Sequence, residues 1–180
     1  MNNTQNISIA IATYNGEKYL AAQLDSILQQ TYPATEIIIV DDCSYDNTWN
    51  ILQRYAEQYP QIKLYCNEHN LGACSSFTRA ISLCSGDYIA LADQDDVWLP
   101  NKLAALLDSF LIHSDAFITD KNLNILAKTF TKGVMDQTNL IDYLFANNVT
   151  GCTCMFTREL VKKSFPIPPD FYIHDHYLAI

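Results

Sequence analysis

The most constraining feature of this sequence is a regular alternation of short apolar runs with longer amphipathic stretches over its first 112 residues. The run Glu36–Val40 is continuous and rich in β-branched residues, which is typical of a strand that is covered on both faces. Four strands are predicted, at 7–13, 36–40, 62–66 and 87–92, with helices at 17–30, 47–58, 73–84 and 100–111. Strands that alternate with helices form β-α-β units, so the sequence predicts an α/β fold with a mostly parallel sheet.

Beyond residue 112 the alternation is less regular. Two further strands are predicted there, at 116–119 and 152–157, and one short helix at 139–146. A chain of 180 residues is long enough to bury one hydrophobic core, so we expect a single domain spanning residues 1–180.

The charge of the chain limits its partners. The formal net charge is −9, and the isoelectric point is about 4.6, which argues against a nucleic-acid partner because such a partner requires a basic face. An anionic substrate would meet a repulsive field and would need a bound cation nearby. The sequence has no apolar run of membrane-spanning length and no signal peptide at its start, so it predicts a cytoplasmic protein.

Three carboxylates follow the fourth predicted strand directly. They are Asp93, Asp95 and Asp96, and the first two point to the same side of an extended segment. Crowded carboxylates repel each other unless a cation or hydrogen-bond donors neutralise them, and hard oxygen ligands suit Mg²⁺ or Mn²⁺. A calcium EF-hand loop is excluded, because the sixth and twelfth positions lack the required Gly and Glu. A metal-held diphosphate is therefore one interpretation, and a solvated acidic loop is the other.

A second acidic pair follows the second predicted strand. Asp41 and Asp42 end that strand, and the carboxyl ends of parallel strands share one edge of a sheet, where ligands bind in open α/β folds. At that edge Asp42 could accept hydrogen bonds from a base or ribose, Asp95 could hold a metal, and Tyr14 could stack on a base. The chain has no G-x-G-x-x-G after its first strand and no Walker lysine motif, so a glycine-rich phosphate loop is not expected.

One further acid stands apart from these pairs. Asp175 lies between two histidines near the end of the sequence. A carboxylate that is ionised near neutral pH could accept a proton from an alcohol. An acid in the first turn of a helix is an equally ordinary interpretation of the same residue.

Taken together, these motifs resemble the family 2 glycosyltransferases, and in particular their bacterial rhamnosyltransferase-like branch, which builds surface polysaccharide. The resemblance covers roughly residues 6–180. The segments that carry it are 11–20 (IATYNGEKYL), 29–33 (QQTYP), 38–48 (IIVDDCSYDNT), 70–72 (NLG), 85–90 (SGDYIA) and 92–100 (ADQDDVWLP).

The resemblance implies a GT-A fold, a nucleotide-diphosphate sugar donor, Mg²⁺ or Mn²⁺, and inversion at the anomeric carbon. By position, Tyr14 and Asp42 are similar to nucleoside contacts of the family, and Ala12 stands where relatives contact the donor. Asp93 is similar to the ribose-side acid of the D-x-D motif. The sugar implied at family level is rhamnose from dTDP-rhamnose, and UDP-sugars remain open.

The remaining site residues follow from the same resemblance. Asp95 is similar to the metal ligand of the D-x-D motif, and Asp96 is a close alternative. Asp175 is similar to the catalytic base, and Gly151 resembles the glycine that opens the acceptor-side strand. The implied acceptor is a hydroxyl of a growing glycan or lipid-linked glycan.

Relatives continue beyond the point where this sequence stops. We therefore expect a C-terminally truncated fold, with a nucleotide-sugar-binding half at 1–112 and a partial acceptor-side half at 113–180. In relatives the additional part often touches the membrane, which would place the protein at the inner membrane face. The alternative function is a catalytically impaired nucleotide-sugar-binding fragment. A sugar nucleotidyltransferase is disfavoured, because the loop after the first strand has no Arg or Lys to bind a triphosphate.

Overall fold

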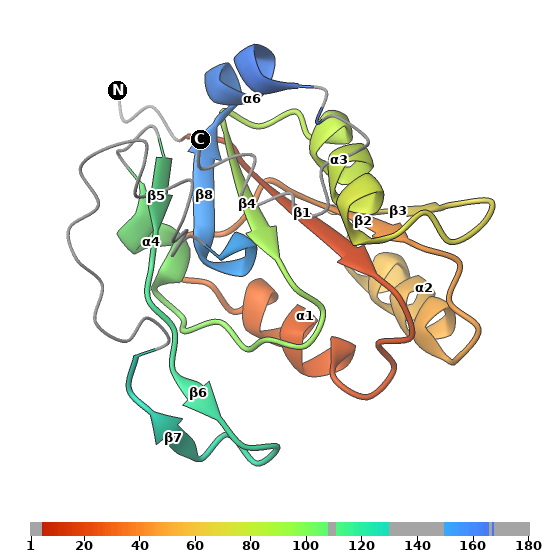
Figure 1. The fold of residues 1–180 in the computed structure, drawn as a ribbon, viewed down its shortest axis with the longest axis horizontal. Helices are drawn as coiled ribbons and strands as arrows, with labels where there is room; N and C mark the ends of the chain where they lie inside the picture. The colour runs from red at the N-terminus through yellow and green to blue at the C-terminus, as the bar shows by residue number, and fades with distance from the viewer. Residues whose placement is uncertain (1–4, 108–110, 130–149, 166, 168–180) are drawn as a thin grey trace.

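The computed structural model describes residues 5–107, 111–129, 150–165 and 167, with side chains left out for 111–113. Its central feature is a six-stranded sheet in the order β3-β2-β1-β4-β8-β5 (Figure 1). The first four strands in this order run parallel, and β8 and β5 are antiparallel to their neighbours. The strands are β1 (Ile7–Thr13), β2 (Glu36–Asp41), β3 (Ile62–Cys66), β4 (Tyr88–Ala92), β5 (Leu111–His113) and β8 (Cys154–Thr157).

Helices cover both faces of this sheet. The helices are α1 (Leu20–Leu28), α2 (Thr48–Gln58), α3 (Ala73–Leu83), α4 (Lys102–Leu106) and α6 (Arg158–Ser164), with a 3₁₀ turn η1 at Gly151–Thr153. One core cluster joins alternate residues of β1, such as Ile9, to the apolar sides of α1, α2 and α4. The other joins the opposite face, including Val40, to α3 and partly buried residues of α6. The continuous apolar run of β2 is thereby buried on both sides, as its sequence predicted.

A two-stranded hairpin projects from this body. It consists of β6 (Ile118–Thr119) and β7 (Ile125–Ala127), which pair antiparallel away from the main sheet (Figure 1). No helix within the described ranges is long and apolar enough to cross a membrane.

Several predicted elements are shorter in the structure, among them the helix at 17–30, which is Leu20–Leu28, and the strand at 116–119, which is Ile118–Thr119, and two further differences are larger or bear on the site. The helix predicted over 100–111 is limited to Lys102–Leu106, and Leu111–His113 is the edge strand β5, which pairs with β8. The apolar spacing of residues 100–111 fits a helix, but pairing with the distant strand β8 determines the structure of the short segment Leu111–His113. The strand predicted over 152–157 begins only at Cys154, after η1. The helix predicted at 139–146 lies outside the described residues.

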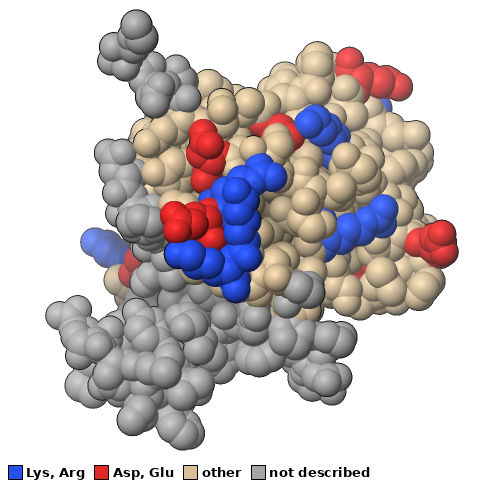
Figure 2. Space-filling model, turned by 90° about the horizontal axis from the view of Figure 1, so that it is seen from above, with Lys and Arg blue, Asp and Glu red and all other residues tan. Residues whose placement is uncertain are grey.

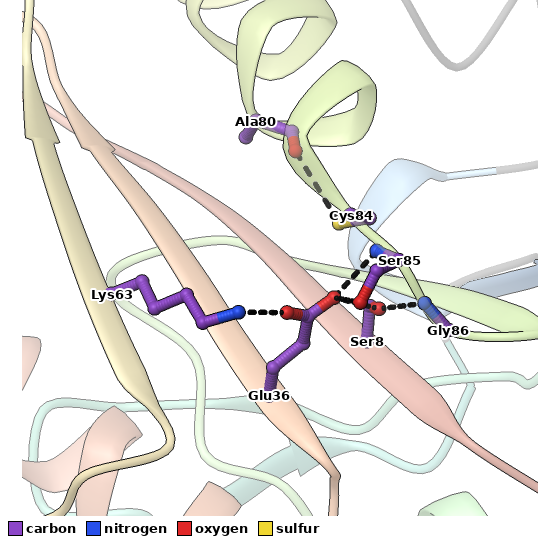
Figure 3. A network of polar contacts seen from close by, with 7 residues as sticks. All are labelled: Ser8, Glu36, Lys63, Ala80, Cys84, Ser85 and Gly86. Atoms are coloured by element: carbon purple, nitrogen blue, oxygen red, sulfur yellow. Dashed lines mark hydrogen bonds and ion pairs between the residues drawn. The ribbon is translucent and has the colours of Figure 1, made fainter.

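The amino ends of the strands are joined by a polar network around Glu36 (Figure 3). The Glu36 carboxylate accepts hydrogen bonds from Ser8 Oγ at 2.7 Å and Ser85 Oγ at 2.8 Å, and it pairs with Lys63 Nζ at 2.6 Å. Ser8 Oγ in turn accepts a hydrogen bond from the Gly86 amide. The network ties β1, β2, β3 and the turn before β4 together at the end of the sheet remote from the predicted site.

That same end of the molecule carries basic side chains. Seen from above, Lys and Arg side chains form a band with Asp and Glu side chains beside them (Figure 2). The short helix α6 lies at this end and contributes Lys162 and Lys163, the latter paired with Glu159 at 2.8 Å. Because β1 and β4 run away from this face, the band is remote from the acids that follow these strands.

Candidate active site

The loops that follow β1, β2 and β4 open on the same edge of the sheet, because these three parallel strands are direct neighbours. Thr13 pairs with Asp41 and Ile11 with Ala92 in the register of the sheet. Tyr14, Asp42 and Asp93 therefore begin their loops side by side. The shared edge predicted from the sequence is present in the structure.

The acid loop is fixed to the loop after β1 by the side chain of Gln94. The Tyr14 amide donates to Gln94 Oε1 at 2.9 Å, and Gln94 Nε2 donates to the Tyr14 carbonyl at 3.0 Å. The side-chain amide thus pairs with a backbone as a neighbouring strand would. Gly16 lies against it, and a Cβ built at Gly16 would lie 2.8 Å from Gln94 Cδ.

The loops after β1 and β2 are fastened to each other as well. The Asn15 amide donates to Ser44 Oγ at 2.9 Å, and the Tyr45 amide donates to Asn15 Oδ1 at 3.0 Å. The Gly16 amide donates to Thr48 Oγ1 at 2.7 Å. Asn15 adopts a positive φ of 51°, a conformation that Asn tolerates better than most residues. These contacts give the rim a defined backbone before any ligand arrives.

Asp42 is buried, with 3% of its surface exposed, and its carboxylate already has three donors. Oδ1 accepts from Asn67 Nδ2 at 2.7 Å and from the Leu71 amide at 2.8 Å, and Oδ2 accepts from the Gly72 amide at 2.8 Å. A carboxylate offers about four acceptor positions, so about one remains for a ligand. Asp42 therefore shapes the loop before α3 in addition to any contact it makes with a nucleoside.

The acids after β4 differ in their surroundings. One oxygen each of Asp93 and Asp96 and the Sγ of Cys152 lie within 4.8 Å of one another, at a spacing that fits a metal ion. Both acids are half-buried, whereas Asp95 is exposed on the turn between them. Carboxylate oxygens are suitable ligands for Mg²⁺ and Mn²⁺, so the donor set fits such an ion.

A half-buried lysine adjoins this acid cluster. Lys102 Nζ lies 3.9 Å from the centre of the Trp98 ring and donates to the Cys152 carbonyl at 2.5 Å. Burial lowers the pKa of Lys102 to about 8, although the nearby acids Asp96 and Asp93 act in the opposite direction. Burial also raises the pKa of the Cys152 thiol, and the negative charges of the acids raise it further. Lys102 thus links η1 to the acid loop and supplies a positive charge beside the acids.

The structure places the other predicted residues as follows. Ala12 is half-buried in β1, where it pairs with Val40, and Tyr14 is 42% exposed at the rim. Gly151 is buried at the start of η1. Asp175 lies outside the described residues, so its predicted role as a base stays a prediction, as do the roles given to the other residues.

Sequence reasoning missed four residues at this rim: Gln94, Tyr45, Lys102 and Cys152. Gln94 stands at the middle position of the acid motif, which the motif leaves unspecified. The other three become relevant only through contacts across the fold, and a single sequence gives no signal for these.

A mostly parallel sheet that is covered by helices and has an acid loop at its carboxyl edge defines a GT-A glycosyltransferase fold. The profile of glycosyl transferase family 2 matches residues 8–165, and the chain belongs to this family. Among its relatives, the UDP-Glc:alpha-D-GlcNAc-diphosphoundecaprenol beta-1,3-glucosyltransferase WfgD of Escherichia coli is 31% identical over 176 residues, covering 96% of this chain and 67% of WfgD. The dTDP-rhamnosyl transferase RfbG of Shigella flexneri is 33% identical over 183 residues, covering 93% of this chain and 63% of RfbG.

Solved structures show the same fold. Staphylococcus aureus TarS 1–349 in complex with UDP superposes with a TM-score of 0.74 at 24% identity, covering 96% of this chain and 53% of TarS. The mannosyltransferase PcManGT from Pyrobaculum calidifontis, in complex with GDP-Man and Mn²⁺, gives a TM-score of 0.68 at 22% identity, covering 97% of this chain and 51% of that protein. The chain thus spans about half to two thirds of the length of the proteins it matches.

Proposed function

We propose that this chain binds a nucleotide-diphosphate sugar and a divalent cation, and that it transfers the sugar, with inversion, to a hydroxyl of a growing cell-surface glycan. The observation that supports this most strongly is the meeting of Tyr14, Asp42 and the acid loop at one edge of the sheet. The matched relatives act with UDP-Glc and dTDP-rhamnose by name, so a pyrimidine nucleotide is the proposed donor and rhamnose one proposed sugar.

In this proposal residues 1–112 bind the donor and 113–180 form part of the acceptor side. Tyr14 and Asp42 contact the nucleoside, Ala12 lines the donor site, and Asp93 lies on the ribose side. Gly151 lies on the acceptor side, at the start of η1 next to Cys152.

The metal would be Mg²⁺ or Mn²⁺. Asp95 is the proposed ligand and Asp96 its alternative, and the half-buried position of Asp96 beside Asp93 supports the alternative. When bound, the ion would offset the negative charge that develops on the departing diphosphate.

Asp175 is the proposed base. It would accept the proton of the acceptor hydroxyl while that oxygen forms a bond to the anomeric carbon and the bond from that carbon to the diphosphate breaks. The proposed acceptor is a glycan or lipid-linked glycan, since WfgD acts on a diphosphoundecaprenol-linked sugar. Such an acceptor would place the reaction at the inner face of the membrane.

A thermal-shift screen of UDP, dTDP, GDP and ADP, each with and without Mn²⁺, tests the proposal. Ligands that bind the folded state raise its melting temperature by mass action. We expect a metal-dependent shift with at least one pyrimidine diphosphate, and no shift with any of the four would contradict the proposal. Asp93→Asn, Asp95→Asn and Asp96→Asn, each compared with the exposed control Glu57→Gln, would identify which acids the metal requires.

Binding without turnover is the alternative function, namely a nucleotide-sugar-binding fragment. Donor hydrolysis and transfer assays with Mn²⁺ separate the two functions. If Asp175 is the base, Asp175→Asn abolishes transfer and leaves donor binding unchanged.

A further inference from the structure

Tyr45 is the most exposed large hydrophobic residue described on the rim, with 83% of its surface exposed. Its ring meets the ring of Tyr14 edge-on, with centroids 6.1 Å apart and planes at 82°. Two perpendicular rings form a corner. A flat aromatic ligand that stacks on one ring of such a corner presents its edge toward the other, and both arrangements are favourable for aromatic pairs.

The backbone beneath Tyr45 is unusually well fixed for so exposed a residue. Its amide donates to Asn15 Oδ1, and the preceding Ser44 bonds to Asp41 through both its amide at 2.9 Å and its hydroxyl at 2.6 Å. The residue before that, Cys43, has a positive φ of 64°. The backbone of Tyr45 is therefore held at the rim before a ligand binds, so binding carries no free-energy cost for ordering this loop.

The position of the corner matters for the proposed donor. Tyr14 follows β1, and both Asp42 and Tyr45 follow β2, the strand that pairs with β1. The base of a nucleoside that contacts both Tyr14 and Asp42 would also come next to the Tyr45 ring.

We infer that Tyr45 is a second aromatic contact for the nucleobase of the donor and forms the base-binding corner together with Tyr14. This inference rests on the proposed function. Tyr45 contributes through the face of its ring, so its hydroxyl is dispensable. The diphosphate lies outside this contact, at the acid loop.

Calorimetric titration of UDP and dTDP in the presence of Mn²⁺ tests the inference. Stacking of a base on an aromatic side chain corresponds to an affinity change of about 5- to 150-fold. We expect Tyr45→Ala to weaken nucleoside diphosphate binding within that range and Tyr45→Phe to stay within about twofold of wild type. Phe117→Ala removes another exposed aromatic ring, 48% exposed next to β6, and should change nothing.

Inorganic pyrophosphate with Mn²⁺ is the control ligand, because it has the diphosphate but lacks the nucleobase. Its binding should be unchanged by Tyr45→Ala. A double-mutant cycle with Tyr14→Ala should be non-additive, since both rings contact the same base. Unchanged melting temperatures of the ligand-free variants would show that the exposed ring is not needed for folding.

Several outcomes would overturn the inference. If Tyr45→Ala binds UDP and dTDP with wild-type affinity, Tyr45 does not contact the base. If Tyr45→Ala loses as much affinity for pyrophosphate as for the nucleoside diphosphates, Tyr45 acts by maintaining the structure of the loop. If Tyr45→Phe loses as much affinity for UDP and dTDP as Tyr45→Ala does, the contact is made by the hydroxyl and not by the ring. Failure of the wild-type chain to bind any nucleoside diphosphate would overturn the proposed function itself, and the inference with it.

Discussion

The side-chain amide of Gln94 pairs with the backbone of Tyr14 through two hydrogen bonds of 2.9 and 3.0 Å. Gln94 separates Asp93 from Asp95, and Tyr14 is the predicted stacking residue for the base. In the proposed function, the base and the diphosphate of the donor would therefore be coupled through this one side chain. The pairing fixes the acid loop against the loop after β1 in addition to the hydrogen bonds of the sheet.

Replacing Gln94 should test that coupling. Gln94→Ala removes both hydrogen bonds and should weaken Mn²⁺-dependent UDP or dTDP binding by up to about 30-fold, since each of the two bonds contributes about 1 kcal/mol. Gln94→Glu keeps the acceptor for the Tyr14 amide and loses the donor, so an intermediate effect is expected. Calorimetry provides the measurement, and Gln58→Ala, at the far end of α2, is the control. Equal affinities of wild type and Gln94→Ala would show that the loops hold their places without this contact.

Asp42 should matter for stability as well as for binding. Asp42→Asn keeps the size of the side chain, but it turns one carboxylate oxygen into an NH₂ group that faces the backbone donors of Leu71 or Gly72. Loss of a charge-assisted hydrogen bond in a buried setting costs about 2–3 kcal/mol. Urea unfolding should show this loss in the absence of any nucleotide. If Asp42→Asn is as stable as wild type, the Asp42 carboxylate does not stabilise the fold.

Much of this fold could be predicted because its signals are local. The run of β2 and the spacing of Leu20, Leu24 and Ile27 on α1 each identify their element without reference to the rest of the chain. The parallel arrangement then places the ends of β1, β2 and β4 on one edge, so the location of the site follows from the alternation of strands and helices.

The details of the site could not be predicted in the same way. The orientations of Asp93, Asp95 and Asp96 depend on a turn whose geometry is set by Gln94 and by the packing of Lys102 against Trp98. Cys152 lies near the acids because η1, the turn before the antiparallel strand β8, comes from a distant part of the chain. Such contacts arise from tertiary structure, and periodicity carries no information about them.

The Glu36 network predicts a specific dependence of stability on pH. Burial would raise the pKa of Glu36, but hydrogen bonds from Lys63, Ser8 and Ser85 outweigh burial and lower the pKa to about 2 (Figure 3). Since the folded-state pKa is below the unfolded value of about 4.5, this stabilisation is complete above pH 4.5 and is lost as the pH falls toward 2. The expected contribution lost between pH 6 and pH 3 is about 2 kcal/mol.

Urea unfolding of wild type and Glu36→Gln at pH 6 and pH 3 measures this contribution. The variant should be less stable at pH 6, because its amide cannot satisfy Lys63 and the Ser85 donors together. The difference between the two proteins should narrow at pH 3. Glu57→Gln, which removes an exposed carboxylate, controls for the general loss of charge. If wild type and Glu36→Gln differ in unfolding free energy by the same amount at both pH values, the pKa of Glu36 is not lowered in the folded state.

Two glycines should respond differently to the same substitution, because different physical causes require them. A Cβ at Gly86 would lie 2.7 Å from the Ser8 backbone nitrogen and 2.8 Å from the Asn6 carbonyl oxygen, so the backbone itself must move. Gly72 has open space around it, but its φ of 84° with a ψ of 161° lies in a region that is essentially confined to glycine, so Gly72→Ala introduces backbone strain of about 2 kcal/mol. Gly86→Ala should cost about 2–3 kcal/mol, because overpacking against backbone is not relieved by side-chain rotation. Urea unfolding of the two variants side by side should rank Gly86→Ala as the less stable, and the reverse order would show that the turn before β4 adjusts more easily than the loop before α3.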